Sequence, residues 1–88
     1  MDFEWDEAKC KANEAKHGVS FELAASFLWA EAIIEPDTRQ DYGEDRFLAR
    51  GLAEDGIGYH IAFTMRGDRV RIITMRRFNR RDYLRYGL

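Results

Sequence analysis

Residues 59–77 decide the fold of this chain: Tyr-His-Ile-Ala-Phe-Thr-Met-Arg at 59–66, Gly67-Asp68, then Arg-Val-Arg-Ile-Ile-Thr-Met-Arg-Arg at 69–77. Both long runs are rich in the β-branched and aromatic residues that favour strands. Glycine as the first of two turn residues is typical of a type II′ hairpin, because glycine takes a positive φ at little cost. The stretch therefore predicts a two-stranded hairpin with Arg66 opposite Arg69.

Side chains alternate across a strand, so this register sorts the hairpin into two faces. An uninterrupted register pairs Phe63 with Ile72 and leaves Arg76 at the edge of the core, beside Tyr59. The core face is expected to hold Ile61, Phe63, Met65, Val70, Ile72 and Thr74. The opposite face is expected to hold His60, Ala62, Thr64, Arg66, Arg69, Arg71, Ile73, Met75 and Arg77. Arginines that face one another repel, so a negatively charged group should meet this second face.

Length and composition indicate one small domain over residues 1–88, in a cytoplasmic protein. The chain has 88 residues, and 45% of them are hydrophobic, which is enough to fold without disulfide bonds or structural metal ions. One cysteine excludes an internal disulfide and fits a reducing compartment. No apolar run approaches the length of a membrane span, and the acidic N-terminus is unlike a signal peptide.

The net charge of −2 hides an uneven distribution. Residues 1–65 contain six Lys and Arg against fourteen Asp and Glu, whereas residues 66–88 contain eight Arg against two Asp. The balance is thus −8 in the first part and +6 in the second. A basic tail of arginine alone favours contact with phosphate or nucleic acid, because the planar guanidinium binds phosphate in a bidentate manner. The alternative is that these arginines pair with acidic residues of the same chain.

Before the hairpin, the patterns predict two helices. Asp6 is a suitable N-cap for a helix over 6–17, whose alanines at 8, 12 and 15 form a narrow apolar stripe, and Gly18 fits its C-terminal end. Ser20 is a suitable N-cap for a second helix from 21 to about 29. These two helices would form an αα-hairpin over one sheet face.

Strands are expected at 3–5, 32–35, 46–52 and from about 57, with a loop over 37–44. Asn79 is a suitable N-cap for a last short helix over 80–86, which Gly87 would close. Helices followed by hairpins indicate an α+β fold. Its antiparallel sheet would be covered on one face by the helical hairpin and would leave the arginine face open.

Several kinds of chemistry have no motif in this chain. The two histidines and one cysteine lie too far apart for zinc spacing, and no glycine-rich phosphate loop or nucleophile elbow occurs. Arginines, lysines, tyrosines and one histidine remain, and such a set suits metal-free cleavage of RNA by its own 2′-hydroxyl. This reaction needs a base, cations on the phosphorane and an acid for the leaving oxygen. Tyrosines can stack on bases.

Longer motifs are similar to those of a known family. These motifs are Phe-Glu-Trp-Asp-Glu-Ala-Lys at 3–9, Asn13, Lys-His-Gly-Val-Ser-Phe-Glu at 16–22, Ala24-Ala25, Gly-Glu-Asp-Arg at 43–46, Arg-Gly-Asp-Arg-Val-Arg-Ile-Ile at 66–73, Arg76-Arg77 and Arg80-Arg81. In this order they resemble the BrnT toxins, and the run at 16–22 is specific. The resemblance implies a RelE-like fold and a metal-independent ribonuclease that arrests translation without a cofactor. It also implies a BrnA antitoxin with a ribbon-helix-helix part. Within the complex, only this antitoxin would bind operator DNA.

By position, the resemblance makes six residues the best site candidates: Lys16, His17, Thr64, Arg66, Arg76 and Arg77. The expected catalytic residues are His17, Arg66, Arg76 and Arg77. The expected RNA-binding residues are Lys9, Lys16, Thr64, Arg69, Arg71, Arg80, Arg81 and Tyr86. His60 stands where the family has an aliphatic residue, so no catalytic role is assigned to it, and Asp82 stands where glutamate is common. The alternative function is a non-catalytic module whose arginine face docks an acidic protein or nucleic acid.

Overall fold

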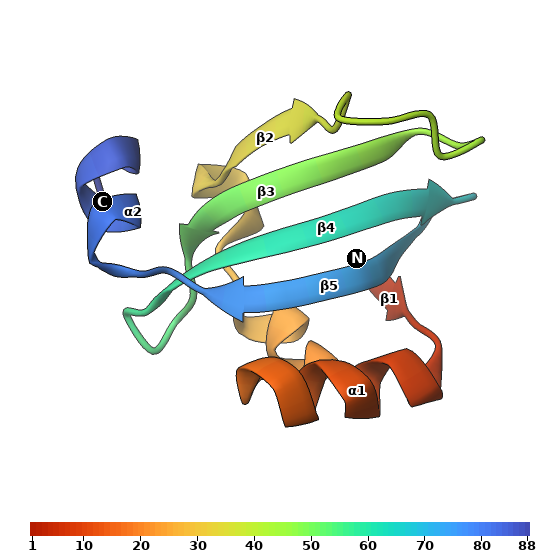
Figure 1. Cartoon of the computed structure of the whole chain (residues 1–88), viewed down its shortest axis with the longest axis horizontal. Helices are drawn as coiled ribbons and strands as arrows, with labels where there is room; N and C mark the ends of the chain where they lie inside the picture. Colours follow the sequence, from red (N-terminus) through yellow and green to blue (C-terminus); the bar gives the residue numbers. More distant parts are fainter.

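Five strands form one mixed sheet in the order β1-β5-β4-β3-β2 (Figure 1). The computed structural model describes residues 1–88. The strands are β1 (Asp2–Glu4), β2 (Ile33–Pro36), β3 (Arg46–Leu52), β4 (Gly58–Arg66) and β5 (Arg69–Arg77). The β1 strand runs parallel to β5, so the prediction of a wholly antiparallel sheet is wrong at this edge. Alternating side chains in a three-residue segment indicate a strand. They do not indicate which strand lies beside it or whether the two strands run parallel.

The first helix, α1 (Glu7–His17), begins and ends as predicted. The Asp6 side chain accepts a hydrogen bond from the backbone N–H of Lys9, and Gly18 closes the helix with a φ of 69°. The predicted alanine stripe is wrong, because Ala8, Ala12 and Ala15 are exposed, whereas Cys10 and Asn13 are buried. The helix lies along β5, where an amide side chain can hydrogen-bond the strand backbone (Figure 1).

The second helical segment is a 3₁₀-helix, η1 (Phe21–Ser26), followed by a short η2 (Trp29–Glu31). The predicted α-helix over 21–29, and with it the αα-hairpin, is therefore wrong, although Ser20 does cap the segment. The buried residues are Phe21, Ala24 and Phe27. Their spacing of three residues fits the three residues per turn of a 3₁₀-helix. The segment still covers the predicted sheet face.

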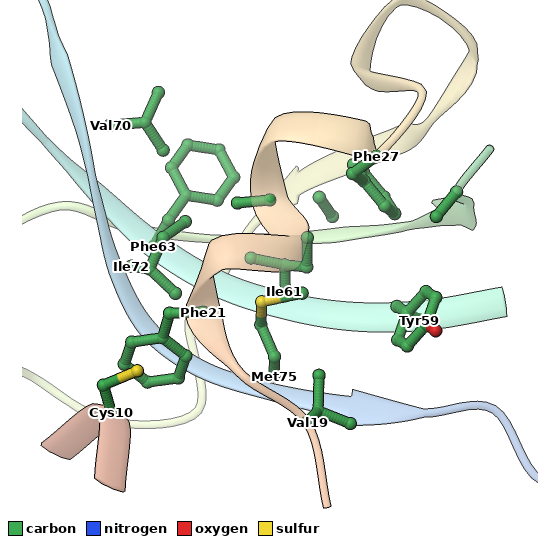
Figure 2. Packing of buried hydrophobic residues seen from close by; sticks show 13 residues of the cluster. Cys10, Val19, Phe21, Phe27, Tyr59, Ile61, Phe63, Val70, Ile72 and Met75 are labelled. Atoms are coloured by element: carbon green, nitrogen blue, oxygen red, sulfur yellow. The ribbon is translucent and has the colours of Figure 1, made fainter. Parts of the chain in front are cut away.

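One cluster of buried side chains lies between the sheet and the helical segments (Figure 2). Its largest fully buried members are Phe21, Tyr59, Ile61, Ile72 and Met75. Figure 2 shows Ile61 and Met75 close to the η1 ribbon, with Phe21 beside Cys10 of α1. The core thus fills one face of the sheet and leaves the other, which we call the open face, for polar and charged side chains.

A β-bulge shifts the register inside the β4–β5 hairpin. The predicted pairing holds from Arg66 opposite Arg69 to Phe63 opposite Ile72, but His60 then pairs with Arg76 and Tyr59 with Arg77. Ile73 is the extra residue, and a slip of one residue exchanges the faces of all side chains beyond it. The predicted faces of Thr74, Met75, Arg76 and Arg77 are therefore wrong. Burial of Met75 in the core stabilises the shifted register by about 2 kcal/mol.

The C-terminal helix α2 (Arg80–Tyr86) has the predicted bounds and the predicted Asn79 cap. Asp82 completes a capping box by accepting a hydrogen bond from the Asn79 backbone N–H. Phe78 packs so closely on Gly58 that a Cβ there would lie 2.3 Å from the ring, and the Tyr83 hydroxyl accepts a hydrogen bond from the Gly58 N–H. These contacts place α2 at one end of the open face. No helix in the structure has the length and apolar character that crossing a membrane requires.

Candidate nucleic-acid interface

Three adjoining hollows run across the open face and along α1, and together we call them the basic track. The first and second hollows share His17 and Thr74, and the second and third share Lys9 and Ile73. Nine lysine and arginine side chains and three carboxylates line the track. Such an excess of cations in adjoining hollows is suited to an extended polyanion.

The first hollow lies between α2 and the sheet and has a volume of about 290 Å³. Its floor is formed by residues of the open face of β3, β4 and β5, namely Arg50, His60, Ala62, Thr74 and Arg76. Asp82, Arg85 and Tyr86 line it from α2. The guanidinium of Arg50 lies over the Tyr86 ring, 5.0 Å from its centroid, so this ring is held in place at the wall of the hollow.

The second hollow, of about 300 Å³, lies between α1 and β5. Lys9, Lys16 and His17 line it from the helix, and Ile73 and Thr74 line it from the strand. Asn13 fixes this arrangement, because its amide donates to the carbonyls of Val19 and Met75 and accepts from the Met75 N–H. The β-bulge at Ile73 therefore forms the strand side of this hollow.

The third hollow is small, about 100 Å³, and lies beside the hairpin turn. Arg46, Thr64, Arg66 and Arg71 line it from the sheet. The Thr64 side chain is buried, and its hydroxyl donates a 2.6 Å hydrogen bond to the Asp45 carbonyl. Thr64 is therefore used to hold the loop before β3.

Most arginines of the track are paired with acidic side chains of the same chain. Arg71 lies 2.7 Å from Glu4, Arg66 and Arg46 lie 3.5 and 3.7 Å from Glu44, and Arg50 is paired with Glu35. These acids come from the N-terminal part of the chain. The sequence left open whether the arginines bind an external anion or internal acids, and the structure shows the internal pairs.

The bulge exchanges the positions of the two neighbouring arginines, which the uninterrupted register placed on opposite faces of the sheet. Arg76 lines the first hollow of the track. Arg77 lies beside Tyr59 and Gly18, in a different hollow of about 440 Å³ next to η1. The prediction that Arg77 shares the open face with Arg66 and Arg71 is therefore wrong.

The remaining sequence candidates divide into two groups. Residues that line the track are Lys9, Lys16, His17, Thr64, Arg66, Arg71, Arg76 and Tyr86. Residues that are exposed but line none of its hollows are Arg69, Arg80 and Arg81. The structure thus brings together most of the predicted set.

Sequence reasoning missed several residues of the track: Arg39, Arg46, Arg50, His60, Thr74, Asp82 and Arg85. A signal existed for two of them, because strand alternation places Arg46 and Arg50 on one face, opposite Thr64 and His60 in the antiparallel register. Another signal existed for the bulge. The apolar positions of β5 change parity between Ile72 and Met75, which an uninterrupted strand with one buried face would not do.

The largely buried side chains of His60 and Asp82 lie next to each other in the first hollow. Nε2 of His60 lies 3.1 Å from Oδ2 of Asp82, but off the direction of a hydrogen bond, so this buried nitrogen has no hydrogen-bond partner. Burial lowers the pKa of His60 below its usual value and outweighs the opposite effect of Asp82. Burial opposes ionisation of Asp82, but the Asn79 N–H and His60 outweigh it and lower the pKa of the carboxyl.

Nowhere in the structure do three or more histidine, cysteine, aspartate or glutamate side chains come together as potential metal ligands. The groups of the track that can bind or polarise a substrate are guanidinium, ammonium, imidazole and phenol groups. Such groups can stabilise negative charge on a phosphoryl group, and an imidazole can transfer protons.

Comparisons with known proteins point to one family. A family model described as "Ribonuclease toxin, BrnT, of type II toxin-antitoxin system" matches residues 5–82. Among solved structures, the crystal structure of the Brucella abortus ribonuclease toxin BrnT matches with a TM-score of 0.71 and 28% sequence identity. The match covers 91% of this chain and 99% of that chain. A comparison with curated proteins found no match.

Proposed function

This chain belongs to the BrnT family of ribonuclease toxins of type II toxin–antitoxin systems, and we propose on that premise that its basic track cleaves RNA without a catalytic metal ion. The single observation that carries the proposal is the adjacency of the three hollows, whose shared lining residues bring cations from α1, β3, β4, β5 and α2 to one surface. RNA is an extended polyanion, and single-stranded RNA offers unstacked bases to aromatic side chains.

In the proposed reaction the 2′-hydroxyl oxygen attacks the neighbouring phosphorus. The new 2′-O–P bond forms as the P–O5′ bond breaks, one proton leaves the 2′-hydroxyl, and another is given to the 5′-oxygen. The products are a 2′,3′-cyclic phosphate and a free 5′-hydroxyl. His17, which lines both the first and second hollows, is our candidate for proton transfer. Arginine stays protonated and can only stabilise charge.

Arg76 is the proposed stabiliser of the phosphorane, because it lines the first hollow and its side chain is 45% exposed. Tyr86 forms a wall of the same hollow and is the proposed stacking surface for a base. Lys9, Lys16, Arg66 and Arg71 would contact the phosphates on either side. Such contacts position the chain of the RNA without reading its sequence.

We further propose that a BrnA-like antitoxin with a ribbon-helix-helix part neutralises this protein, and that operator DNA is bound only through that antitoxin. Cleavage of translated RNA would place its action in the cytoplasm and arrest translation. A second candidate function is a non-catalytic docking module. The internal ion pairs of Arg46, Arg50, Arg66 and Arg71 favour it, because an arginine already paired contributes less to catalysis.

The neighbouring arginines allow a matched test. Purified protein should cleave a single-stranded RNA in excess EDTA. Arg76→Ala should lower kcat/KM by about 10²- to 10³-fold, as removal of one transition-state donor does elsewhere. Arg77→Ala removes a charge of the same kind one residue away and outside the track. This variant should lower kcat/KM far less.

Three results of that experiment would contradict the proposal in different ways. Activity lost in EDTA and restored only by Mg²⁺ or Mn²⁺ would exclude the metal-free mechanism. Equal loss in both arginine variants would mean that the track is not the site. Binding of RNA without any cleavage would support the docking module.

A further inference from the structure

Three groups converge on one oxygen of Asp82, at the end of the basic track where α2 meets the sheet. Oδ2 accepts the Asn79 backbone N–H at 2.8 Å, and it lies 3.1 Å from Nε2 of His60 and 3.6 Å from Nη1 of Arg76. The Asp82 side chain is only 11% exposed and that of His60 15%. His60 and Arg76 therefore compete for the same largely buried acceptor, Oδ2 of Asp82.

The helix cap accounts for Asp82 but not for His60. Asp82 satisfies the Asn79 N–H in the capping box, and this contact needs no histidine. The His60 ring packs on Phe78 at 4.8 Å and on Tyr86 at 5.9 Å between centroids, which an aliphatic side chain would also do. An aliphatic side chain would not supply a buried ring nitrogen that lacks a hydrogen bond and faces the carboxylate 3.6 Å from Nη1 of Arg76.

The charged groups around His60 come from several elements. Asp82 from α2, Arg76 from β5 and Arg50 from β3 act on it directly. His17 from α1, Arg39 from the loop before β3 and Arg85 from α2 line the same hollow. Asp82 is the only acid among them, and Arg50 is already paired with Glu35. A proton gained by His60 therefore has one carboxylate to pair with, the one that Arg76 contacts.

We propose that His60 and Asp82 are positioning residues for Arg76: Asp82 holds the guanidinium against α2 when the imidazole is neutral, and a protonated His60 takes the carboxylate and releases Arg76 toward the RNA phosphate. The exchange of partners takes place in the protein without RNA. Its effect on RNA binding rests on the proposed function. Because the protonated His60 pairs with Asp82 and leaves the charge of Arg76 unpaired, the hollow gains one positive charge, and RNA should bind more tightly as the pH falls.

The first experiment needs no RNA. In the free protein, NMR spectra from pH 8 to pH 5 should show the His60 ring titrating and the Arg76 side-chain resonance moving with the same midpoint. Asp82→Asn keeps an oxygen for the Asn79 N–H but removes the charge, so it should lower the pKa of His60 and abolish the response of Arg76. Glu14→Gln, an equal loss of charge on the outer side of α1, should change neither. An Arg76 resonance that ignores the titration of His60 would overturn the proposal.

The second experiment measures the consequence. Binding of an uncleavable 2′-O-methyl RNA should tighten by roughly tenfold as the pH falls through the pKa of His60, the size of effect that one partly buried charge produces. His60→Gln keeps a polar side chain that cannot ionise, so its affinity should lack that rise, whereas Glu14→Gln should retain it. A wild-type affinity that does not change with pH would overturn the proposal. No binding of RNA at any pH, with the NMR response present, would instead contradict the proposed function and leave the positioning role established.

Discussion

At the scale of single residues, Asp37 shows how a loop can be held without secondary structure. Its side chain is 1% exposed, and it accepts hydrogen bonds from the side chain and backbone N–H of Arg39 and from the Tyr42 hydroxyl. The hydrogen bond from the Arg39 side chain has the largest effect, and together these contacts hold the pKa of Asp37 far below its usual range. The loop that Asp37 anchors carries Glu44, which contacts Arg46 and Arg66 of the basic track.

We expect Asp37→Asn to lower the free energy of unfolding by about 2 kcal/mol at pH 7, because it removes charge-assisted hydrogen bonds from a buried site. A carboxyl whose pKa is lower in the folded state stabilises it fully above the unfolded pKa of about 3.9. That contribution is lost as the pH falls through the folded pKa. The difference between variant and wild type, measured by urea unfolding, should therefore shrink below about pH 4.

Asp41→Asn is the matched control for this prediction. Asp41 lies in the same loop, is exposed, and accepts only the Gly43 N–H, which asparagine can also satisfy. Its unfolding free energy should stay close to that of the wild type. A pH-independent difference for Asp37→Asn would show that packing, rather than charge, makes Asp37 important.

At the scale of elements, β5 is the strand on which the site depends. It pairs with β4 along its length, with β1 only at Arg69–Arg71, and beyond that with the side chain of Asn13 at Met75. Asn13 acts there as a one-residue substitute for a neighbouring strand. It also sets how closely α1, and thus Lys16 and His17, approach Thr74.

We expect Asn13→Ala to lower the free energy of unfolding by about 3 kcal/mol, although alanine is the better helix former. The loss arises because the buried N–H and C=O of Met75 and the Val19 carbonyl lose their hydrogen bonds to Asn13. Urea unfolding measures this change. Glu14→Ala, on the exposed side of the same helix, should be neutral or slightly stabilising. Near-equal stabilities of the two variants would mean that β5 does not need this partner.

At the scale of the whole molecule, folding reunites charges that the sequence separates. The acidic first part of the chain, at −8, supplies Glu4, Glu35 and Glu44 to the open face, where they meet arginines of β3, β4 and β5. The face is thus a partly neutralised surface whose cations are already oriented. RNA, or an acidic segment of an antitoxin, would have to exchange places with these acids.

We expect an antitoxin to neutralise the protein by covering the basic track, so that antitoxin and RNA exclude each other. Binding of each should weaken as salt is raised, because exposed charges more than about 10 Å apart are screened at 0.1 M. The measurement is a competition titration: labelled, uncleavable RNA on the toxin, with antitoxin added in steps. A ternary complex that keeps its RNA at saturating antitoxin would show instead that the antitoxin grips another surface and acts by distortion.

The sequence by itself determined the features that depend on neighbouring residues. The Asp6 cap, the Gly18 end of α1, the Gly67-Asp68 turn and the Asn79 cap of α2 lie where the sequence predicts them. Each is stabilised by hydrogen bonds or backbone preferences within a few residues. The family resemblance depends on motifs of the same local kind, and it is confirmed over residues 5–82.

The tertiary structure alone decided which side chains meet beyond the bulge and at α2. The bulge at Ile73 depends on the burial of Met75 against residues far away in the sequence, and it alone sends Arg76 rather than Arg77 to the open face. The pairing of His60 with Asp82 likewise requires α2 to fold back over the sheet. The parity change of the apolar positions in β5 indicates a register shift, but the position of the bulge and the docking of α2 are decided by the free energy of the packed core.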